Sequence, residues 1–217
     1  MPTTTNFGWT TPADTGLVKD GASAIRTLGN GIDTSLVDLK GGTTSQVLTK
    51  DSATDLDFSW KSSGLTLVKN QTIGSAVSSV TVSDAFSSTY DNYRILITGG
   101  ASSAAIEYTL TFGSTTSGYK WNILVNTYGS TNTVAGSTSD SSISVFRATA
   151  SGINTVIEVL SPNLAKHTAV RGYSVESGQF NVVTAIVPNT TAYTAFTITN
   201  VSGTLTGGNI RVYGYGN

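Results

Sequence analysis

The sequence predicts a mainly β protein, with a short N-terminal helical stem and a C-terminal antiparallel β-sandwich or jelly-roll knob. Three observations lead to this prediction. Apolar residues recur at helical spacing near the N-terminus, alternation with period two begins at Leu65, and turn-rich spacers interrupt that alternation at short intervals. We therefore divide the chain into a tail (1–13), a helical stem (14–40), a short β shaft (41–64) and a β-sandwich knob (65–217).

The composition excludes several classes of function. Charged residues make up 12% of the 217 residues and the net charge is -1, so the chain has no basic excess for the phosphates of nucleic acids. It has no cysteine, which excludes disulfides and thiolate metal sites and fits synthesis in a reducing cytoplasm. Its apolar runs are too short to span a membrane, and we expect no signal peptide, because threonines and not a basic region follow Met1-Pro2.

The stem carries an apolar stripe with the spacing of a heptad repeat. Steps of three and four residues separate its members, with Gly21 and Ser35 filling the gaps: Val18, Ile25, Leu28, Ile32 and Leu39. Glycines inside this helix each cost roughly 1 kcal/mol relative to alanine, and a helix this short is marginal in water. We expect the stripe to be buried, either against copies of itself in a homo-oligomer or against the globular part of its own chain.

Local signals mark the ends of the stem. Asp14 is the expected N-cap, and Lys40 followed by Gly41 and Gly42 is the expected stop. The triplet Gly29-Asn30-Gly31 is a point at which the helix could divide into two pieces.

The tail and the shaft are both too small to be stable alone. Phe7 and Trp9 are large aromatics in an otherwise polar tail, and we expect them to dock on the stem or to insert into a partner, with the partner preferred. In the shaft, two β-like runs, Gln46–Lys50 and Leu56–Trp60, predict one hairpin. A single hairpin is marginally stable at best in water, so it too needs a neighbour.

The rest of the chain predicts eight to ten short antiparallel strands. Ile106–Phe112 is typical, with apolar residues on one face and Glu107, Thr109 and Thr111 on the other. The spacers between strands include Gly113–Gly118, Gly129–Asp140 and Ser202–Gly208. The expected strands are Tyr93–Ile97, Ile106–Phe112, Tyr119–Val125, Ile143–Phe146, Ile153–Leu160, Val170–Val175, Phe180–Val187, Ala192–Thr199 and Ile210–Tyr215.

Three segments together resemble bacteriophage fibre proteins. Phe7-Gly-Trp9, Pro12 and Leu17–Ile32 resemble the virion-proximal start of phage tail-fibre and head-fibre proteins. Gly41–Lys50 with Asp57–Trp60 is similar to a shaft repeat of such fibres, and Gly207–Gly214 is similar to the last strand of phage knob domains. The resemblance implies a homotrimer, anchored to other virion proteins through Phe7, Trp9 and Pro12, with the β knob exposed for host attachment.

Motifs for catalysis are weak. Gly113–Gly118 superficially suggests a P-loop, but Tyr119 stands where the phosphate-binding lysine should be. His167 is the single histidine, so a multi-histidine metal site cannot form, and we expect it at the surface or on an edge strand. Glu107 and Glu158 lie in predicted strands and should point to solvent or to an oligomer interface.

Loop aspartates leave one enzymatic alternative open. Asp84, Asp91 and Asp140 fall in predicted loops and could serve a polysaccharide-degrading spike or bind calcium, although turn formation is the more economical interpretation. We expect no catalytic residues, no metal and no cofactor.

Three aromatics are the candidate receptor contacts. Tyr119, Trp121 and Tyr128 lie at or near one predicted strand and could stack on sugar rings. Trp121 shares a face with Tyr119 and Ile123, which favours its burial, whereas Tyr128 precedes a polar loop and should be exposed.

The preferred hypothesis is a non-enzymatic virion fibre or spike, made in the cytoplasm of a bacterial host and located in the virion. Its partners would be itself, other virion proteins and a host surface glycan or protein, without nucleic acid or membrane insertion. The alternatives are a capsid decoration protein, of the cement or head-fibre kind, and a polysaccharide-degrading tailspike.

Overall fold

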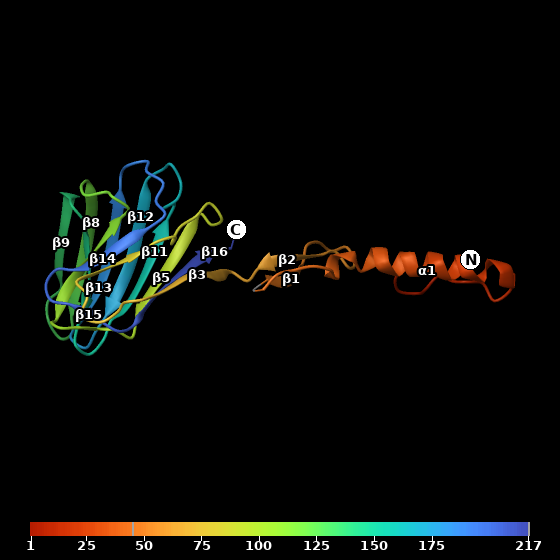
Figure 1. Cartoon of the computed structure of the whole chain (residues 1–217), viewed down its shortest axis with the longest axis horizontal. Coiled ribbons are helices and arrows are strands. Elements are labelled where there is room, and N and C mark those ends of the chain that lie inside the picture. Colours follow the sequence, from red (N-terminus) through yellow and green to blue (C-terminus); the bar gives the residue numbers. More distant parts are fainter. Residues whose placement is uncertain (45, 217) are drawn as a thin grey trace. The chain divides into compact units, whose positions relative to one another are not determined.

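The computed structural model describes residues 1–44 and 46–216 and divides into two compact units, Met1–Ser63 and Gly64–Asn217 (Figure 1). Ser45, in the shaft-like motif, and Asn217, at the end of the predicted knob, lie outside the described residues. The predicted fold class is confirmed: one N-terminal helix precedes antiparallel sheets that form a β-sandwich.

The first unit contains one continuous helix. The α-helix α1 spans Gly21–Ser35 and is flanked by the 3-10 turns η1 (Val18–Asp20) and η2 (Val37–Leu39). Asp20 precedes α1, so the expectation that Asp14 caps the helix was wrong. The triplet Gly29-Asn30-Gly31 does not divide it, because both glycines adopt ordinary helical torsion angles. None of the described helices is long and apolar enough to cross a membrane.

A two-stranded hairpin completes this unit. Strand β1 (Gln46–Lys50) pairs antiparallel with β2 (Phe58–Ser62), and Leu48 lies opposite Trp60. The second strand starts two residues later than expected, because Leu56 has a φ of 61° and cannot belong to an extended strand.

The second unit is a sandwich of an eight-stranded and a four-stranded antiparallel sheet. The eight-stranded sheet has the order β3-β16-β5-β11-β12-β13-β8-β9, and the four-stranded sheet the order β10-β7-β14-β4. A short pair, β15 and β6, is separate from both. The strands are β3 (Leu65–Thr72), β4 (Ser79–Val82), β5 (Asn92–Thr98), β6 (Ala101–Ser102), β7 (Ile106–Phe112), β8 (Tyr119–Thr127), β9 (Thr133–Asp140), β10 (Ile143–Ala148), β11 (Asn154–Leu160), β12 (Thr168–Val175), β13 (Gln179–Val187), β14 (Phe196–Asn200), β15 (Leu205–Thr206) and β16 (Asn209–Tyr215).

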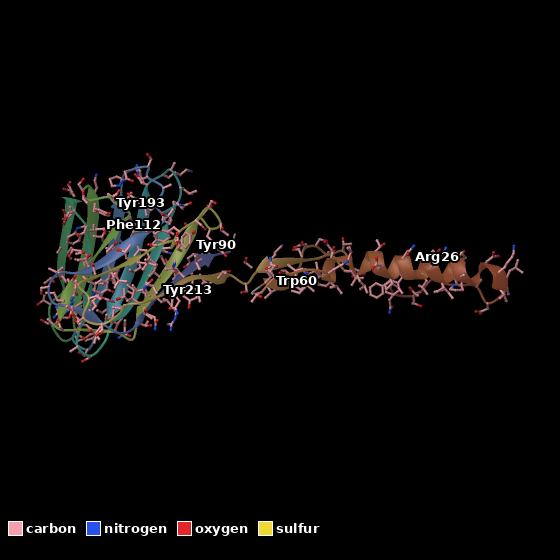
Figure 2. All side chains as sticks on the ribbon, viewed as in Figure 1. Arg26, Trp60, Tyr90, Phe112, Tyr193 and Tyr213 are labelled. Carbon is pink, nitrogen blue, oxygen red and sulfur yellow. The ribbon has the colours of Figure 1, made fainter. Side chains whose placement is uncertain are left out.

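The core of the sandwich forms from alternate residues of these strands. Ile95, Ile157 and Val183 of the large sheet are fully buried, as are Leu110 and Phe196 of the small one. Aromatic rings fill much of the space; Phe112 and Tyr193, for example, lie 5.4 Å apart between ring centroids (Figure 2). This core gives the second unit the means to fold on its own.

Two segments differ from the expected strand pattern. Thr133–Asp140 was expected to be part of a spacer but forms β9, an edge strand paired with β8 through its backbone. Strand β14 begins at Phe196 and not at Ala192; Tyr193 instead holds loops together, because its backbone and side chain bond to Pro162, Asn163 and Thr115.

Candidate functional site

The first unit has no core. None of its described residues, 1–44 and 46–63, is buried, although it contains a helix and a hairpin. Its large apolar side chains are instead exposed: Val18 is 97% and Ile25 65% accessible to solvent. The others are Met1, Phe7, Leu17, Leu36, Val37, Leu39, Val47 and Leu48. This unit therefore presents an apolar surface that its own described residues leave uncovered.

The predicted stripe accounts for much of that surface. Leu28 and Ile32 are half-buried on α1, whereas Val18, Ile25 and Leu39 are exposed. The two ends of the stripe lie in η1 and η2. The stripe is thus present along the helical segment, and the rest of the first unit leaves it partly open.

The tail docks on the helix of its own chain. The Trp9 indole N–H donates to the Ser35 hydroxyl at 2.9 Å, and its ring covers Gly31, where a Cβ would lie 3.7 Å from Trp9 Cδ1. Phe7 stacks on Trp9 with 5.0 Å between ring centroids, and it stays 48% exposed. Of the two expectations for Trp9, the contact with the stem is the one present here; Phe7 and Pro12 are exposed.

The outer face of the four-stranded sheet is polar and almost uncharged. Thr81, Thr197 and Thr111 lie side by side across three strands, and the hydroxyls of Thr81 and Thr197 are 2.9 Å apart. The next row is made of Ser79, Thr199, Thr109 and Ser144. This is the usual pattern of an antiparallel sheet with one face on a core and one face in water.

The outer face of the eight-stranded sheet breaks that pattern. One row of directly paired residues crosses six strands and carries only apolar or aromatic side chains; we call it the apolar row. Within it Val134 is 67% and Tyr173 40% exposed. Its members are Val134, Leu124, Val182, Tyr173, Val156 and Leu96.

A charged cluster occupies the neighbouring row of the same face. Glu158 on β11 lies between Arg94 of β5 and Arg171 of β12, which are its direct cross-strand partners. The Arg171 Nε–H donates to one carboxylate oxygen of Glu158, and the Tyr215 hydroxyl donates to the other at 2.7 Å. Opposite charges at paired positions stabilise a sheet modestly, and here they also neutralise the carboxylate.

This environment keeps Glu158 ionised. The hydrogen bond from Tyr215, followed by the contacts with Arg171 and Arg94, lowers the pKa of Glu158 below its ordinary value. Partial burial and the adjacent carboxylate raise the pKa of Tyr215. A carboxylate held in this way is suited to fixing a surface in place and unsuited to donating a proton near neutral pH.

A hollow of about 330 Å³ lies beside this cluster. Val156, Val182 and Tyr173 line it, together with Thr184 and the charged cluster. Gly172 passes beneath it without a side chain, because a Cβ there would clash with the Val156 carbonyl oxygen and approach Phe146 Cζ to 3.1 Å.

The candidate receptor contacts do not form one surface, and the expectation that Tyr119 contacts a receptor was wrong. It is fully buried: its hydroxyl accepts the Phe112 N–H at 2.8 Å and donates to the Thr115 carbonyl at 3.1 Å. Burial raises its pKa to about 12. Tyr119 therefore anchors the loop that follows β7 and is not available to a receptor.

Trp121 and Tyr128 differ in exposure as expected. Trp121 is half-buried against the core, and its indole N–H donates to Asp140 at 3.2 Å. Tyr128 is 57% exposed at the turn after β8. Tyr128 is the member of the trio whose position suits contact with a partner.

The remaining titratable candidates are dispersed. Glu107 is exposed on the outer face of the small sheet, Asp84 occupies a turn at φ 53°, and His167 is exposed just before β12. Asp140 accepts hydrogen bonds from Trp121 and from Ser141. Within residues 1–44 and 46–216, no three His, Cys, Asp or Glu side chains gather in a way that could hold a metal ion.

Sequence alone did not single out the outer face of the large sheet. Its cluster depends on β16 pairing with β5 and on β5 pairing with β11, contacts that join residues far apart in the chain. The signal that could have found it is the presence of apolar residues at both alternations of Tyr93–Ile97 and Phe180–Val187, which indicates burial on both sides.

Comparison with known proteins adds little. No protein-family model and no curated protein matches the chain. Against the crystal structure of the infectious bursal disease virus VP2 subviral particle, the TM-score is 0.12 at 8% sequence identity, over 79% of this chain and 46% of that one. The chain spans less than half the length of that protein, and we draw no conclusion about fold or function from a similarity this low.

Proposed function

We propose that this protein is a non-enzymatic structural protein of a bacteriophage virion, a homotrimeric fibre or spike. Its first unit would hold the copies together and attach them to the virion, and its β-sandwich would be presented for host attachment. The observation that carries this proposal is the absence of any buried residue among the described residues of Met1–Ser63.

A unit without a core gains stability when it associates with other chains. An isolated helix of 15 residues and a lone hairpin are each marginal in water. Fully burying one Val, Leu or Ile side chain contributes about 1.5–3 kcal/mol, and this unit leaves its large apolar side chains at least partly exposed. Association of identical copies along the stripe would supply the missing core, as it does in coiled coils.

The sequence resemblance supports the remaining parts of the proposal. The segments around Phe7–Trp9, Leu17–Ile32 and Gly41–Lys50 resemble phage fibres, which implies three copies and an N-terminal virion anchor. Phe7 and Pro12, both exposed, are the residues that could meet a virion partner. Three sandwiches on one assembly would bind a host surface by avidity, even if each contact is weak.

The state of the carboxylates favours a structural role over hydrolysis of polysaccharides. Glu158 is bonded to Tyr215 and Arg171, and Glu176 forms an ion pair with Arg147 at 2.8 Å. Glycoside hydrolysis needs a carboxylic acid that can donate a proton and a second carboxylate about 5–10 Å away. The pKa of Glu158 is lowered by these contacts, whereas such a proton donor requires a raised pKa.

The mass of the purified protein in solution tests this proposal. Light scattering should give about three times the chain mass of 22.5 kDa at micromolar concentration. A mass of one chain would contradict the assembly. Electron microscopy of intact particles labelled with an antibody against the sandwich then tests the virion location, since an unlabelled particle would exclude it.

A further inference from the structure

The two sheets of the sandwich expose different kinds of side chain to solvent. The small sheet presents Ser and Thr to solvent, as a sheet with one wet face should. The large sheet presents the apolar row, in which Val134, Leu124 and Tyr173 are exposed and the other members are half-buried. Contiguous exposed apolar patches of this kind mark interaction surfaces in soluble proteins.

We propose that the outer face of the eight-stranded sheet is covered by the sandwich of a second copy of this chain. The proposal rests on the assembly proposed above and names a second contact within it. The stem would bring the copies together, and the apolar row would then pack between neighbouring sandwiches.

The composition of the face suits contact with protein. Tyr173 and Tyr213 provide aromatic surface, and the row of the charged cluster carries Arg94 and Arg171; a lysine, Lys120, appears only in the next row of this face. Interfaces are enriched in Tyr and Arg and depleted in Lys. Glu158 is already neutralised within its own sheet, so covering it leaves no unpaired carboxylate. The hollow over Val156 and Val182 offers room for an apolar side chain of the neighbour.

The small area of this surface favours contact with a second copy that is already joined to the first through the N-terminal unit. The apolar row and the charged row beside it cross six strands, and with about 4.8 Å per strand and two outward positions along each, these two rows cover on the order of 400 Å². A standard interface uses about 800 Å² per partner. These two rows are too small to hold a free partner tightly, whereas a copy already joined through the first unit meets them at high effective concentration.

The absence of cysteine from the chain allows a direct test. Two single-cysteine variants of the full chain, Thr184→Cys and Thr81→Cys, place a thiol at exposed threonines on the large and the small sheet. The rate of maleimide labelling is measured on the native protein and in urea, with the mass determined on the same samples. Val134→Cys, at a position 67% exposed in one chain, is a second probe of the large sheet.

We expect native Thr184→Cys and Val134→Cys to react at least fivefold more slowly than Thr81→Cys, with equal rates in urea. A difference smaller than fivefold in a trimeric sample overturns this inference and leaves the proposed assembly intact; the face would then be free for a different partner. A mass of one chain overturns both. Slow labelling at a mass of one chain also overturns it, because the cover would then come from the same chain.

Discussion

Trp9 and Ser35 are joined by a hydrogen bond of 2.9 Å between the indole N–H and the serine hydroxyl, across 26 residues of sequence. The same hydroxyl donates to the Gly31 carbonyl at 2.9 Å. Ser35 is thus the polar member of the stem stripe because it holds the tail on the last turn of α1. The small side chains at positions 31 and 35 make room for the tryptophan ring on one flank of the stripe.

Replacement of this serine should loosen the tail. Ser35→Ala leaves the half-buried indole N–H without its partner, at a cost of about 1 kcal/mol to the free energy of unfolding. Thermal unfolding followed by circular dichroism at the helix band measures the loss. The matched control is Ser23→Ala on an exposed part of α1, which should be neutral or slightly stabilising. Equal effects of the two substitutions would show that the bond contributes nothing.

A charge on the stripe should dissociate the assembly. Ile25→Asp puts a carboxylate at a position that is 65% exposed in one chain but buried in the proposed trimer. Loss of the buried side chain alone removes about 1.5–3 kcal/mol per copy, and burial of the charge adds to this. Light scattering should therefore give a mass near that of one chain. Asn30→Asp, exposed elsewhere on α1, should leave the mass unchanged. If both variants keep the wild-type mass, the stripe is not the contact.

A methyl group at Gly172 should destabilise the sandwich. In Gly172→Ala the added carbon would clash with the Val156 carbonyl oxygen and press on Phe146, and overpacking of this kind costs about 1–3 kcal/mol. Urea unfolding of the sandwich measures the change. Gly178→Ala has no atom within 4 Å of the new carbon and should change stability by about 0.5 kcal/mol at most. Wild-type stability of Gly172→Ala would contradict the packing described here.

Stability should depend on pH through Glu158. Its pKa is lower in the folded protein than in the unfolded chain, so its contribution is fully present above the unfolded pKa and is lost as pH falls through the folded pKa. Between pH 7 and pH 3 the wild type should therefore lose more unfolding free energy than Glu158→Gln does. Tyr215→Phe removes the largest cause of the shift and should fall between the two. Parallel profiles for all three proteins would rule out this coupling.

The sequence predicted those elements whose signal is local. Alternation over Ile106–Phe112 gave the bounds of β7 correctly, because one face of that strand lies on the core and the other meets water. The helical spacing of Ile25, Leu28 and Ile32 located α1 for the same kind of reason. The start of the helix was misplaced, since both Asp14 and Asp20 have the side chain of an N-cap and the sequence does not distinguish them.

The features that the sequence did not predict depend on contacts between residues that are far apart in the chain. Strand β9 consists mostly of small and polar residues, because this edge strand is exposed on most of its surface; backbone pairing with β8 and the hydrogen bond from Trp121 to Asp140 hold it. Tyr119 was among the receptor candidates because aromatic rings can stack on sugars, although the face it shares with Trp121 and Ile123 already favoured burial. Its hydroxyl finds the buried Phe112 N–H only once the loop between β7 and β8 has folded.

The lack of a core in Met1–Ser63 has a consequence for how a newly made chain matures. The sandwich can fold as soon as it is synthesised, at a rate independent of how many chains are present. In the proposed trimer the N-terminal unit would gain its stabilising contacts only when sister chains meet, so its folding should accelerate with concentration. Chains diluted soon after synthesis would then carry a folded sandwich and a marginally stable N-terminal unit, and only chains at high concentration would complete their assembly.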